Sequence, residues 1–276
     1  THEFQIGDRI CIGADVPSMQ DYWSKNGMAN LSDINYAVGY QFPGGYAEYC
    51  LLNELTLNFG PVAKIPNNLS FEEASLTEPL ACCINGLERA FMEPGKSVLV
   101  IGAGPIGILL CRAALAFGAG LVVIVDNDPK RADQAKALGL SNAYSMVETN
   151  LPELTRQITD AQGFNIVLTA CSSPDAQEQA VELVSKRGVV NFFGGLPRDS
   201  RLIHIASNTV HYREAYITGS HGSSPRHFKL ALQLIASGKI QVRDLISHKF
   251  ALKDIQQGFE IAECRQGLKV TIVPEL

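Results

Sequence analysis

Between residues 97 and 219, short apolar runs typical of strands alternate with longer stretches whose apolar positions have the period of a helix. Short, fully apolar runs predict strands at 98–101, 121–125, 143–145, 166–170, 189–193 and 216–219. Stretches of helical period lie between them and predict helices at 106–117, 130–138, 151–160, 176–185 and 207–214. Strands that are apolar on both faces and joined by helices are typical of a parallel sheet covered on both sides. This region therefore predicts an α/β fold with a doubly wound, six-stranded parallel sheet.

The flanking regions have a different pattern. Before residue 78 the pattern predicts short strands in 4–14, 46–52 and 63–65, and Ser70 with Glu73 forms a capping box at a helix start. A helix is predicted over 79–91, and after residue 222 helices at 226–237 and 253–263 are separated by a loop to Phe250 and followed by a strand at 269–273. We expect 1–78 and 222–276 to form one mostly β unit into which 79–221 is inserted.

Composition narrows the class of protein. The chain has 276 residues, of which 46% are hydrophobic and 18% charged, as in an ordinary globular protein. Its net charge of -5 argues against nucleic-acid binding, and no apolar run is long enough to suggest a membrane span. Residues 1–9 do not resemble a signal peptide. The seven cysteines form no Cys-x-x-Cys pair and lie mostly in apolar segments, which indicates reduced thiols in a cytoplasmic protein.

The stretch from Ser97 to Asp126 carries the clearest chemical signal. It reads as a buried strand, the turn Gly102-Ala103-Gly104-Pro105-Ile106-Gly107, a helix, and a second buried strand that ends at Asp126. The first glycine allows the tight turn, the second admits a pyrophosphate, and the third allows close helix packing. The helix start offers N–H groups to phosphate oxygens. An acid at the end of the second strand binds ribose hydroxyls and repels a 2′-phosphate, so the stretch predicts NAD rather than NADP.

Further motifs extend the comparison to the whole chain. Four other motifs accompany the glycine turn: Gly7-Asp8-Arg9, Gly44-Gly45-Tyr46-Ala47-Glu48-Tyr49, Glu78-Pro79-Leu80 and Gly194-Gly195. In this combination the chain resembles the zinc-type medium-chain dehydrogenase/reductases, on the sorbitol and threonine dehydrogenase branch. The resemblance implies a Rossmann NAD-binding domain inserted in a partial GroES-like catalytic domain. It also implies zinc-assisted hydride transfer between an alcohol and NAD.

Two departures concern zinc. The family carries a zinc-binding Cys and a Gly-His-Glu motif upstream of the region where this sequence opens, and His2-Glu3 lacks the preceding glycine. The catalytic zinc shell is therefore incomplete in this sequence, as in a fragment of a longer protein or a metal-free descendant. The family's structural zinc lobe has four cysteines, and the matching positions here are Ser18, Asp21, Ser24 and Ser32. Hydroxyl groups stay protonated and bind zinc poorly, so we expect no structural zinc there.

Glu78 is the catalytic candidate. The resemblance places a Glu of this motif at the catalytic zinc or its bound water, while the plainer interpretation is a favourable acid in the first turn of a helix. Ends of the later strands point to Cys171, Gly194, Gly195 and Ser220 as residues near the nicotinamide. Cys171 is expected to be a lining residue rather than a nucleophile.

Two further residues leave alternatives open. Lys269 is expected to reach the pyrophosphate or to be simply solvated. His221 is expected at a hinge or surface, with the cleft as the other reading.

The resulting prediction is NAD-dependent oxidation of a secondary alcohol, of polyol or sugar-alcohol type, to a ketone. Two alternatives stay open: an NAD-binding subunit without turnover, and a zinc-free quinone or enone reductase, a branch that usually prefers NADPH. The strand at 216–219 should lie at the sheet edge, and the resemblance implies that two such edges join in a homodimer or homotetramer.

Overall fold

The computed structural model describes residues 3–274, so His2 of the His2-Glu3 pair lies outside the described residues. The chain divides into two compact units, Thr1–Cys82 with His221–Leu276 (unit 1) and Cys83–Ser220 (unit 2). Helix α4 (Thr77–Arg89) contributes residues to both. No described helix combines the length and apolar character that a bilayer crossing requires.

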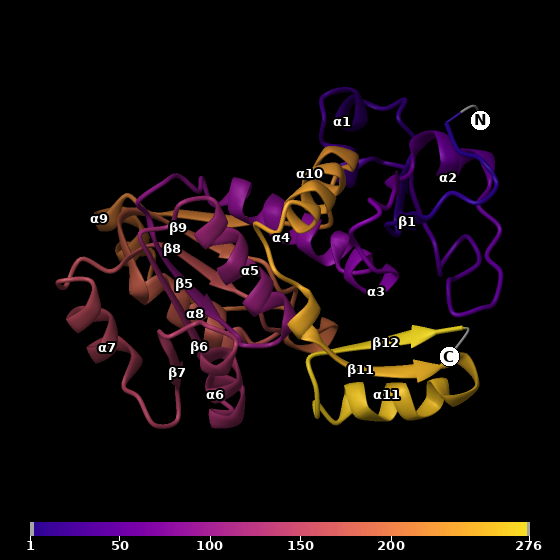
Figure 1. Cartoon of the computed structure of the whole chain (residues 1–276). Helices are drawn as coiled ribbons and strands as arrows, with labels where there is room; N and C mark the ends of the chain where they lie inside the picture. Colours follow the sequence, from indigo (N-terminus) through magenta and orange to yellow (C-terminus); the bar gives the residue numbers. More distant parts are fainter. Residues whose placement is uncertain (1–2, 275–276) are drawn as a thin grey trace. The chain divides into compact units, whose positions relative to one another are not determined.

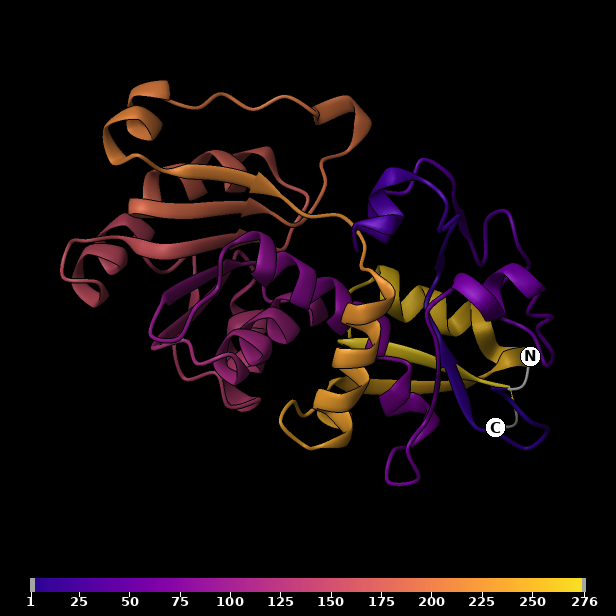
Figure 2. The ribbon, with the colours of Figure 1, turned by 90° about the horizontal axis from the view of Figure 1, so that it is seen from above.

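Unit 2 is built on a six-stranded parallel sheet, as the sequence predicts, and the strands lie in the order β10-β9-β8-β5-β6-β7 (Figure 1). Its strands are β5 (Ser97–Ile101), β6 (Leu121–Asp126), β7 (Ala143–Ser145), β8 (Phe164–Thr169), β9 (Val184–Phe192) and β10 (Tyr216–Gly219). Its helices are α5 (Pro105–Ala116), α6 (Pro129–Ala137), α7 (Leu151–Ile158), α8 (Pro174–Leu183) and α9 (Ser207–Arg213), with a 3-10 turn at Arg198–Ser200. Figure 2 shows the strands, coloured from magenta to orange, running side by side. The doubly wound architecture is therefore confirmed.

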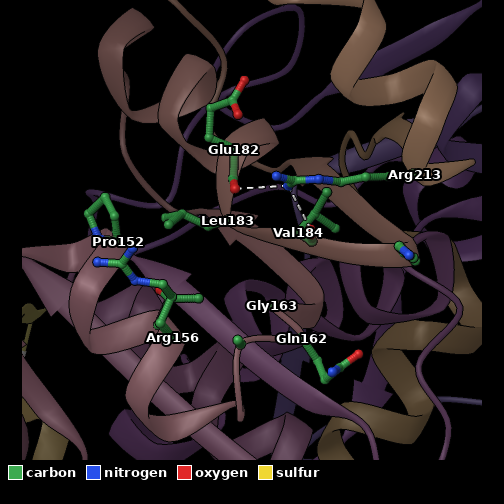
Figure 3. A pocket seen from close by; sticks show the side chains of 11 residues that line it. Pro152, Arg156, Gln162, Gly163, Glu182, Leu183, Val184 and Arg213 are labelled. Carbon is green, nitrogen blue, oxygen red and sulfur yellow. Dashed lines mark hydrogen bonds between the residues drawn. The ribbon is translucent and has the colours of Figure 1, made fainter.

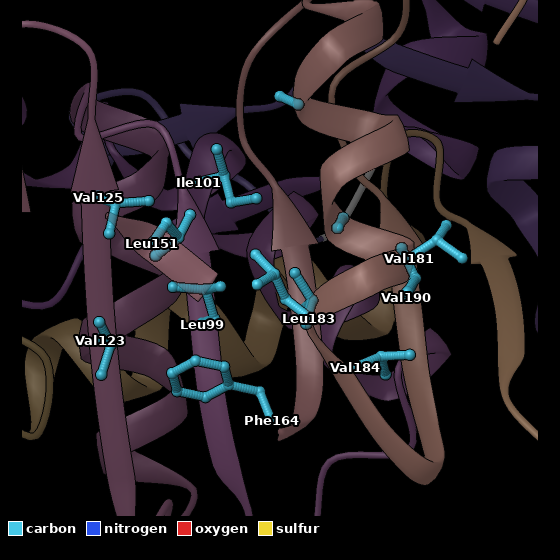
Figure 4. Close-up of a cluster of buried hydrophobic side chains, with 13 residues drawn as sticks. Leu99, Ile101, Val123, Val125, Leu151, Phe164, Val181, Leu183, Val184 and Val190 are labelled. Atoms are coloured by element: carbon cyan, nitrogen blue, oxygen red, sulfur yellow. The ribbon is translucent and has the colours of Figure 1, made fainter. Parts of the chain in front are cut away.

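The core of unit 2 lies between this sheet and its helices (Figure 4). Side chains from four strands and from α8 form one buried cluster, which includes Leu99, Val123, Phe164, Val167, Ala180, Val181 and Val190. Burying apolar surface on this scale is the main favourable term in folding. Because helices cover the strands, their sequences are apolar at consecutive positions instead of alternating.

Unit 1 is assembled from short elements. Two-stranded sheets pair β1 (Ile10–Ile12) with β4 (Val62–Lys64), β2 (Asp15–Pro17) with β3 (Asn35–Ala37), and β11 (Ile246–Ala251) with β12 (Lys269–Val273). Its helices are α1 (Tyr22–Lys25), α2 (Glu54–Phe59), α3 (Phe71–Ala74), α10 (Pro225–Ala236) and α11 (Ile255–Glu263), with 3-10 turns at Ala29–Leu31, Arg243–Leu245 and Leu252–Asp254. In Figure 1, β11 and β12 lie side by side with α11 along them. The predicted capping box of Ser70 and Glu73 is present at the start of α3.

Two expectations for unit 1 are wrong. Residues 46–52 follow a glycine turn and are predicted to form a strand, but they join none of the described sheets, and the centroid of the Tyr46 ring lies 5.6 Å from that of Phe259. A strand needs a partner for its N–H and C=O groups, and no described strand pairs with this segment. The predicted loop before Phe250 contains β11, whose parallel partner β12 lies later in the chain.

Candidate functional site

The glycine turn of unit 2 has the geometry that its sequence requires. Gly102 has φ +114°, in the region that favours glycine, and its N–H donates to the Val125 carbonyl at 2.7 Å. A Cβ on Gly107 would lie 1.8 Å from the Gly102 carbonyl oxygen, so only glycine fits where α5 meets the turn. A Cβ on Gly104 would meet nothing within 4 Å. The open side of Gly104 therefore leaves space for a ligand, whereas Gly107 is enclosed by backbone.

Helix α5 begins directly after this turn. Gly104 is its N-cap residue, Pro105 follows in the first turn, and Ile106 comes next. Proline suits this position because its missing N–H would have no helical partner and its φ is already helical. The helix start consequently presents backbone N–H groups and the positive end of the helix dipole beside the open space at Gly104.

Asp126 ends β6 and connects that strand to the glycine turn. Its Oδ2 accepts a hydrogen bond from the Ala103 N–H at 2.7 Å, and its Oδ1 accepts one from the Asp128 N–H at 2.9 Å. The carboxylate is only partly buried. Each carboxylate oxygen has a second lone pair, so Asp126 can accept further hydrogen bonds from two hydroxyl groups. Sequence reasoning did not anticipate that Asp126 also holds the turn in place.

The other predicted cofactor residues of unit 2 follow the neighbouring strands. Gly194 follows β9, and a Cβ there would lie 2.5 Å from the Cys171 carbonyl oxygen, whereas Gly195 is open. Burial raises the pKa of the Cys171 thiol, and the charge of Asp126 raises it further. A protonated thiol is a poor nucleophile, which favours the role of a lining residue.

Ser220 is held by a buried polar ladder that the sequence analysis missed. Its Oγ donates to Asn191 Oδ1 at 3.0 Å, and Asn191 Nδ2 donates to Thr218 Oγ1 at 3.0 Å. Asn191 is fully buried within β9. A buried amide is costly unless it is hydrogen-bonded, so an asparagine inside an otherwise apolar strand was the available signal. These contacts fix the carboxyl ends of β9 and β10.

A surface hollow of unit 2 lies at the amino-terminal ends of β8 and β9, the opposite ends of these strands from Cys171 and Gly194 (Figure 3). It is lined by α7, by residues just before β8, and by the junction of α8 with β9. Arg213 Nη1 donates there to the carbonyls of Glu182 and Val184, at 2.8 and 2.9 Å. Arg213 thus caps the C-terminus of α8. None of the predicted site residues lines this hollow.

Glu78 lies in the first turn of α4, within unit 1, and is partly buried. Cys82 Sγ donates to its Oε1 at 3.2 Å. Burial raises the pKa of the Glu78 carboxyl, Asp15 raises it further, and Cys82 and Lys269 lower it. The structure therefore brings Lys269, at the start of β12, beside Glu78, and it adds Asp15, which sequence reasoning missed.

The four lobe positions come together in unit 1. Asp21 Oδ2 accepts hydrogen bonds from the hydroxyls of Ser18, at 3.0 Å, and Ser32, and its Oδ1 accepts one from the Ser24 N–H at 2.8 Å. Ser32, followed by the Ser24 backbone, holds the pKa of Asp21 well below its usual range. A carboxylate that accepts these hydrogen bonds organises the residues that the resemblance matches to cysteines. The absence of structural zinc stays a prediction.

We expect Asp21→Asn to loosen this lobe. A group whose pKa is lowered in the folded state stabilises the fold above its ordinary pKa, so the contribution is complete at neutral pH and is lost only in strong acid. The variant should lower Tm by a few degrees at pH 7, and a chelator should leave the difference in Tm between the variant and the wild type unchanged. Thermal unfolding followed by circular dichroism measures both effects. A bound zinc that stabilises the wild type but not Asp21→Asn would contradict this account, because it would indicate a zinc site at this lobe.

Comparisons with known proteins agree with the geometry. The family described as "Zinc-binding dehydrogenase" matches residues 105–237. A probable D-xylulose reductase A of Aspergillus fumigatus is 29% identical over 273 residues, which cover 97% of this chain and 74% of that protein. The sorbitol dehydrogenase of Bacillus subtilis is 27% identical and covers 99% of this chain and 76% of its own length.

Solved structures give the same result. An alcohol dehydrogenase from Thermus superposes with a TM-score of 0.86 at 26% identity, covering 98% of this chain and 78% of that one. An Escherichia coli oxidoreductase of unknown specificity superposes with a TM-score of 0.90 at 25% identity, covering 99% and 78%. Together with the glycine turn and the parallel sheet, these matches show that the chain is similar over nearly its whole length to zinc-type medium-chain dehydrogenases, and that residues 105–237 match their zinc-binding dehydrogenase family.

Proposed function

We propose that this chain is an NAD-dependent dehydrogenase that oxidises a secondary alcohol of polyol or sugar-alcohol type to a ketone. The observation that carries the proposal is the arrangement of unit 2, where the open turn at Gly104 and the carboxylate of Asp126 lie beside the start of α5. The relatives named as xylulose reductase and sorbitol dehydrogenase support a polyol substrate.

The residues present fit a nicotinamide dinucleotide. Backbone N–H groups at the start of α5 would hold the pyrophosphate, and Asp126 would accept from the ribose hydroxyls of the adenosine half. Cys171, Gly194, Gly195 and Ser220 would line the nicotinamide end. When bound, the nicotinamide supplies the hydride acceptor. The protein's contribution is to orient it and to favour NAD over NADP through the negative charge of Asp126.

The residues described do not complete a metal site. Within residues 3–274, no group of three or more His, Cys, Asp and Glu side chains is close enough to hold a metal ion. Glu78 is the residue that we assign to the metal or to its bound water, and the other catalytic ligands are not among the described residues. We therefore derive no step through zinc, although zinc is the cofactor that the family name indicates.

An activity assay tests the proposal. Protein supplied with zinc and NAD should produce NADH from sorbitol or xylitol, measured by absorbance at 340 nm, and the NADP rate should be lower. The negative charge of Asp126 causes this preference because it repels a 2′-phosphate. Saturable NAD binding without turnover of any polyol would indicate a sensing or structural subunit. Faster turnover of a quinone or enone with NADPH would indicate the zinc-free reductase instead.

We also propose that the chain assembles as a homodimer or homotetramer through β10. This strand pairs only with β9 among the described strands and carries the exposed side chains of Tyr216 and Ile217. An apolar sheet edge favours pairing with a second copy. Ile217→Lys should therefore convert the assembly to smaller species in light scattering after size exclusion, while unit 2 stays folded. A wild type that is monomeric at micromolar concentration would refute this assembly.

The compartment is a separate proposal. All seven cysteines are free thiols in the structure. Free thiols in apolar surroundings are typical of a reducing compartment, which supports a cytoplasmic location.

A further inference from the structure

The carboxyl groups of Asp15 and Glu78 lie close enough in unit 1 to influence each other. The charge of Asp15 raises the pKa of Glu78, and both side chains are partly buried. The backbone at Gly13 lies against the start of α4: a Cβ added to Gly13 would lie 3.4 Å from Glu78 Cγ. Two acids that share a partly buried region repel each other, which costs stability. Such an arrangement is typical of a functional site rather than of packing.

Two basic side chains accompany these acids. Burial raises the pKa of the Asp15 carboxyl, whereas His221 lies beside it and lowers that pKa, as Lys269 does for the carboxyl of Glu78. The four side chains come from β2, α4, the segment before α10, and β12. The backbone at Gly222 presses against Asp15, since a Cβ there would lie 2.8 Å from Asp15 Oδ2. Residues 221 and 222 therefore lie against the carboxylate of Asp15, although they are far from it in the sequence.

The ribbon of β2 and β3 positions Asp15. Asp15 pairs with Ala37, and Pro17 pairs with Asn35, so Asp15 and Asn35 are diagonal neighbours on one face. The side chain of Asn35 interacts with Asp15 as a hydrogen-bond donor. Its Oδ1 is buried and has no hydrogen-bond partner among the described residues. The pair of Asp15 and Asn35, together with the unsatisfied Oδ1 of Asn35, indicates that this face could bind a ligand with hydrogen-bonding groups.

We propose that Asp15 is a substrate-binding residue, whose carboxylate accepts hydrogen bonds from hydroxyl groups of the polyol on carbons other than the one oxidised. The inference rests on the proposed function and extends it to substrate choice. An ionised carboxylate only accepts hydrogen bonds, at up to about four lone-pair positions, and a polyol offers a donor on every carbon. A simple secondary alcohol has no hydroxyl group for Asp15, so Asp15 selects polyols over such alcohols.

The test compares two substrates in two variants. Sorbitol carries the additional hydroxyl groups, whereas 2-butanol carries only the reacting one. Asp15→Asn keeps the shape of the side chain and replaces one acceptor oxygen by a donor. Asp33→Asn is the matched control. Asp33 is an exposed acid of the same unit, and its substitution removes one negative charge, as Asp15→Asn does. All proteins are full-length chains with NAD and zinc.

We expect Asp15→Asn to raise KM for sorbitol by roughly 10- to 100-fold, the loss of one or two hydrogen bonds to a charged group. The kcat for sorbitol and the kcat/KM for 2-butanol should stay within about twofold of the wild type, because the reacting carbon is bound elsewhere. Asp33→Asn should behave as the wild type with both substrates. Titration calorimetry of sorbitol into the NADH complex should show the same weakening for Asp15→Asn alone.

Other outcomes overturn the inference. An equal loss with both substrates would give Asp15 a structural or chemical role instead of a selective one. Unchanged KM and unchanged calorimetric affinity for sorbitol would exclude contact with the substrate. If the wild type oxidises polyols and Asp15→Asn keeps the same preference for sorbitol over 2-butanol, the inference is refuted and the proposed function stands. A wild type that neither binds nor oxidises sorbitol refutes both.

Discussion

Gly107→Ala is expected to lower Tm by roughly 6–12 °C and to abolish NAD binding. The loss of Tm follows from overpacking, which costs about 3 kcal/mol, because each kcal/mol lowers the Tm of a domain of this size by a few degrees. The added Cβ would lie 1.8 Å from the Gly102 carbonyl oxygen, which belongs to backbone and cannot rotate away. Helix α5 must therefore move away from β5, and the turn between them moves with it. Thermal unfolding and NADH fluorescence titration measure the two effects.

Gly104→Ala is the matched control for this substitution. A Cβ at Gly104 meets nothing within 4 Å, so the variant should unfold at the wild-type temperature. The methyl group would nevertheless occupy the space that the pyrophosphate needs. We expect NADH binding to weaken roughly a hundredfold, the loss of one or two hydrogen bonds to a charged phosphate. A Gly104→Ala protein that binds NADH as tightly as the wild type would show that the dinucleotide binds elsewhere.

Asp126→Ser is expected to change the choice of cofactor. NAD affinity should fall roughly 10- to 100-fold with loss of the ribose hydrogen bonds, and NADP affinity should rise because the repulsion of its 2′-phosphate disappears. The ratio of the two dissociation constants is the quantity to measure. Asp126 also accepts from the Ala103 N–H at 2.7 Å, so the variant should lose some stability.

Two further variants separate these roles of Asp126. Asp126→Asn retains an acceptor oxygen for the turn and removes the charge, so it should change the cofactor ratio with a smaller loss of Tm. Asp128→Asn removes a charge two residues away and keeps an N-cap side chain for α6, where Asp128 accepts from the Lys130 N–H. It should leave the ratio unchanged. An unaltered ratio in both Asp126 variants would remove Asp126 from the ribose site.

The sheet of unit 2 was predictable because its signals are local. The predicted strands at 143–145 and 216–219 coincide with β7 and β10. Helix starts were predicted one or two residues late at Pro105, Pro129 and Pro174, since apolar periodicity becomes visible only after the proline. Proline belongs to the first turn of each helix because its φ is helical and its missing N–H has no helical partner there.

The site of unit 1 was predictable only in part. Glu78 stands in a recognisable motif, but Asp15, His221 and Lys269 come from distant segments, and no spacing in the sequence relates them. The strand predicted over 46–52 failed for a related reason, because pairing depends on a partner that local pattern does not reveal. Asn191 could have been noticed as an amide within an apolar run, whereas its bonds to Thr218 and Ser220 depend on the fold.

Hydride tracing tests the central claim most directly. Sorbitol labelled with deuterium on the carbon that is oxidised is incubated with the protein, zinc and NAD, and the products are analysed by mass spectrometry. The account predicts one ketone per NADH, with the deuterium on C4 of the nicotinamide and a slower rate than for unlabelled sorbitol. Bound NAD that stays oxidised and unlabelled with every polyol would contradict it.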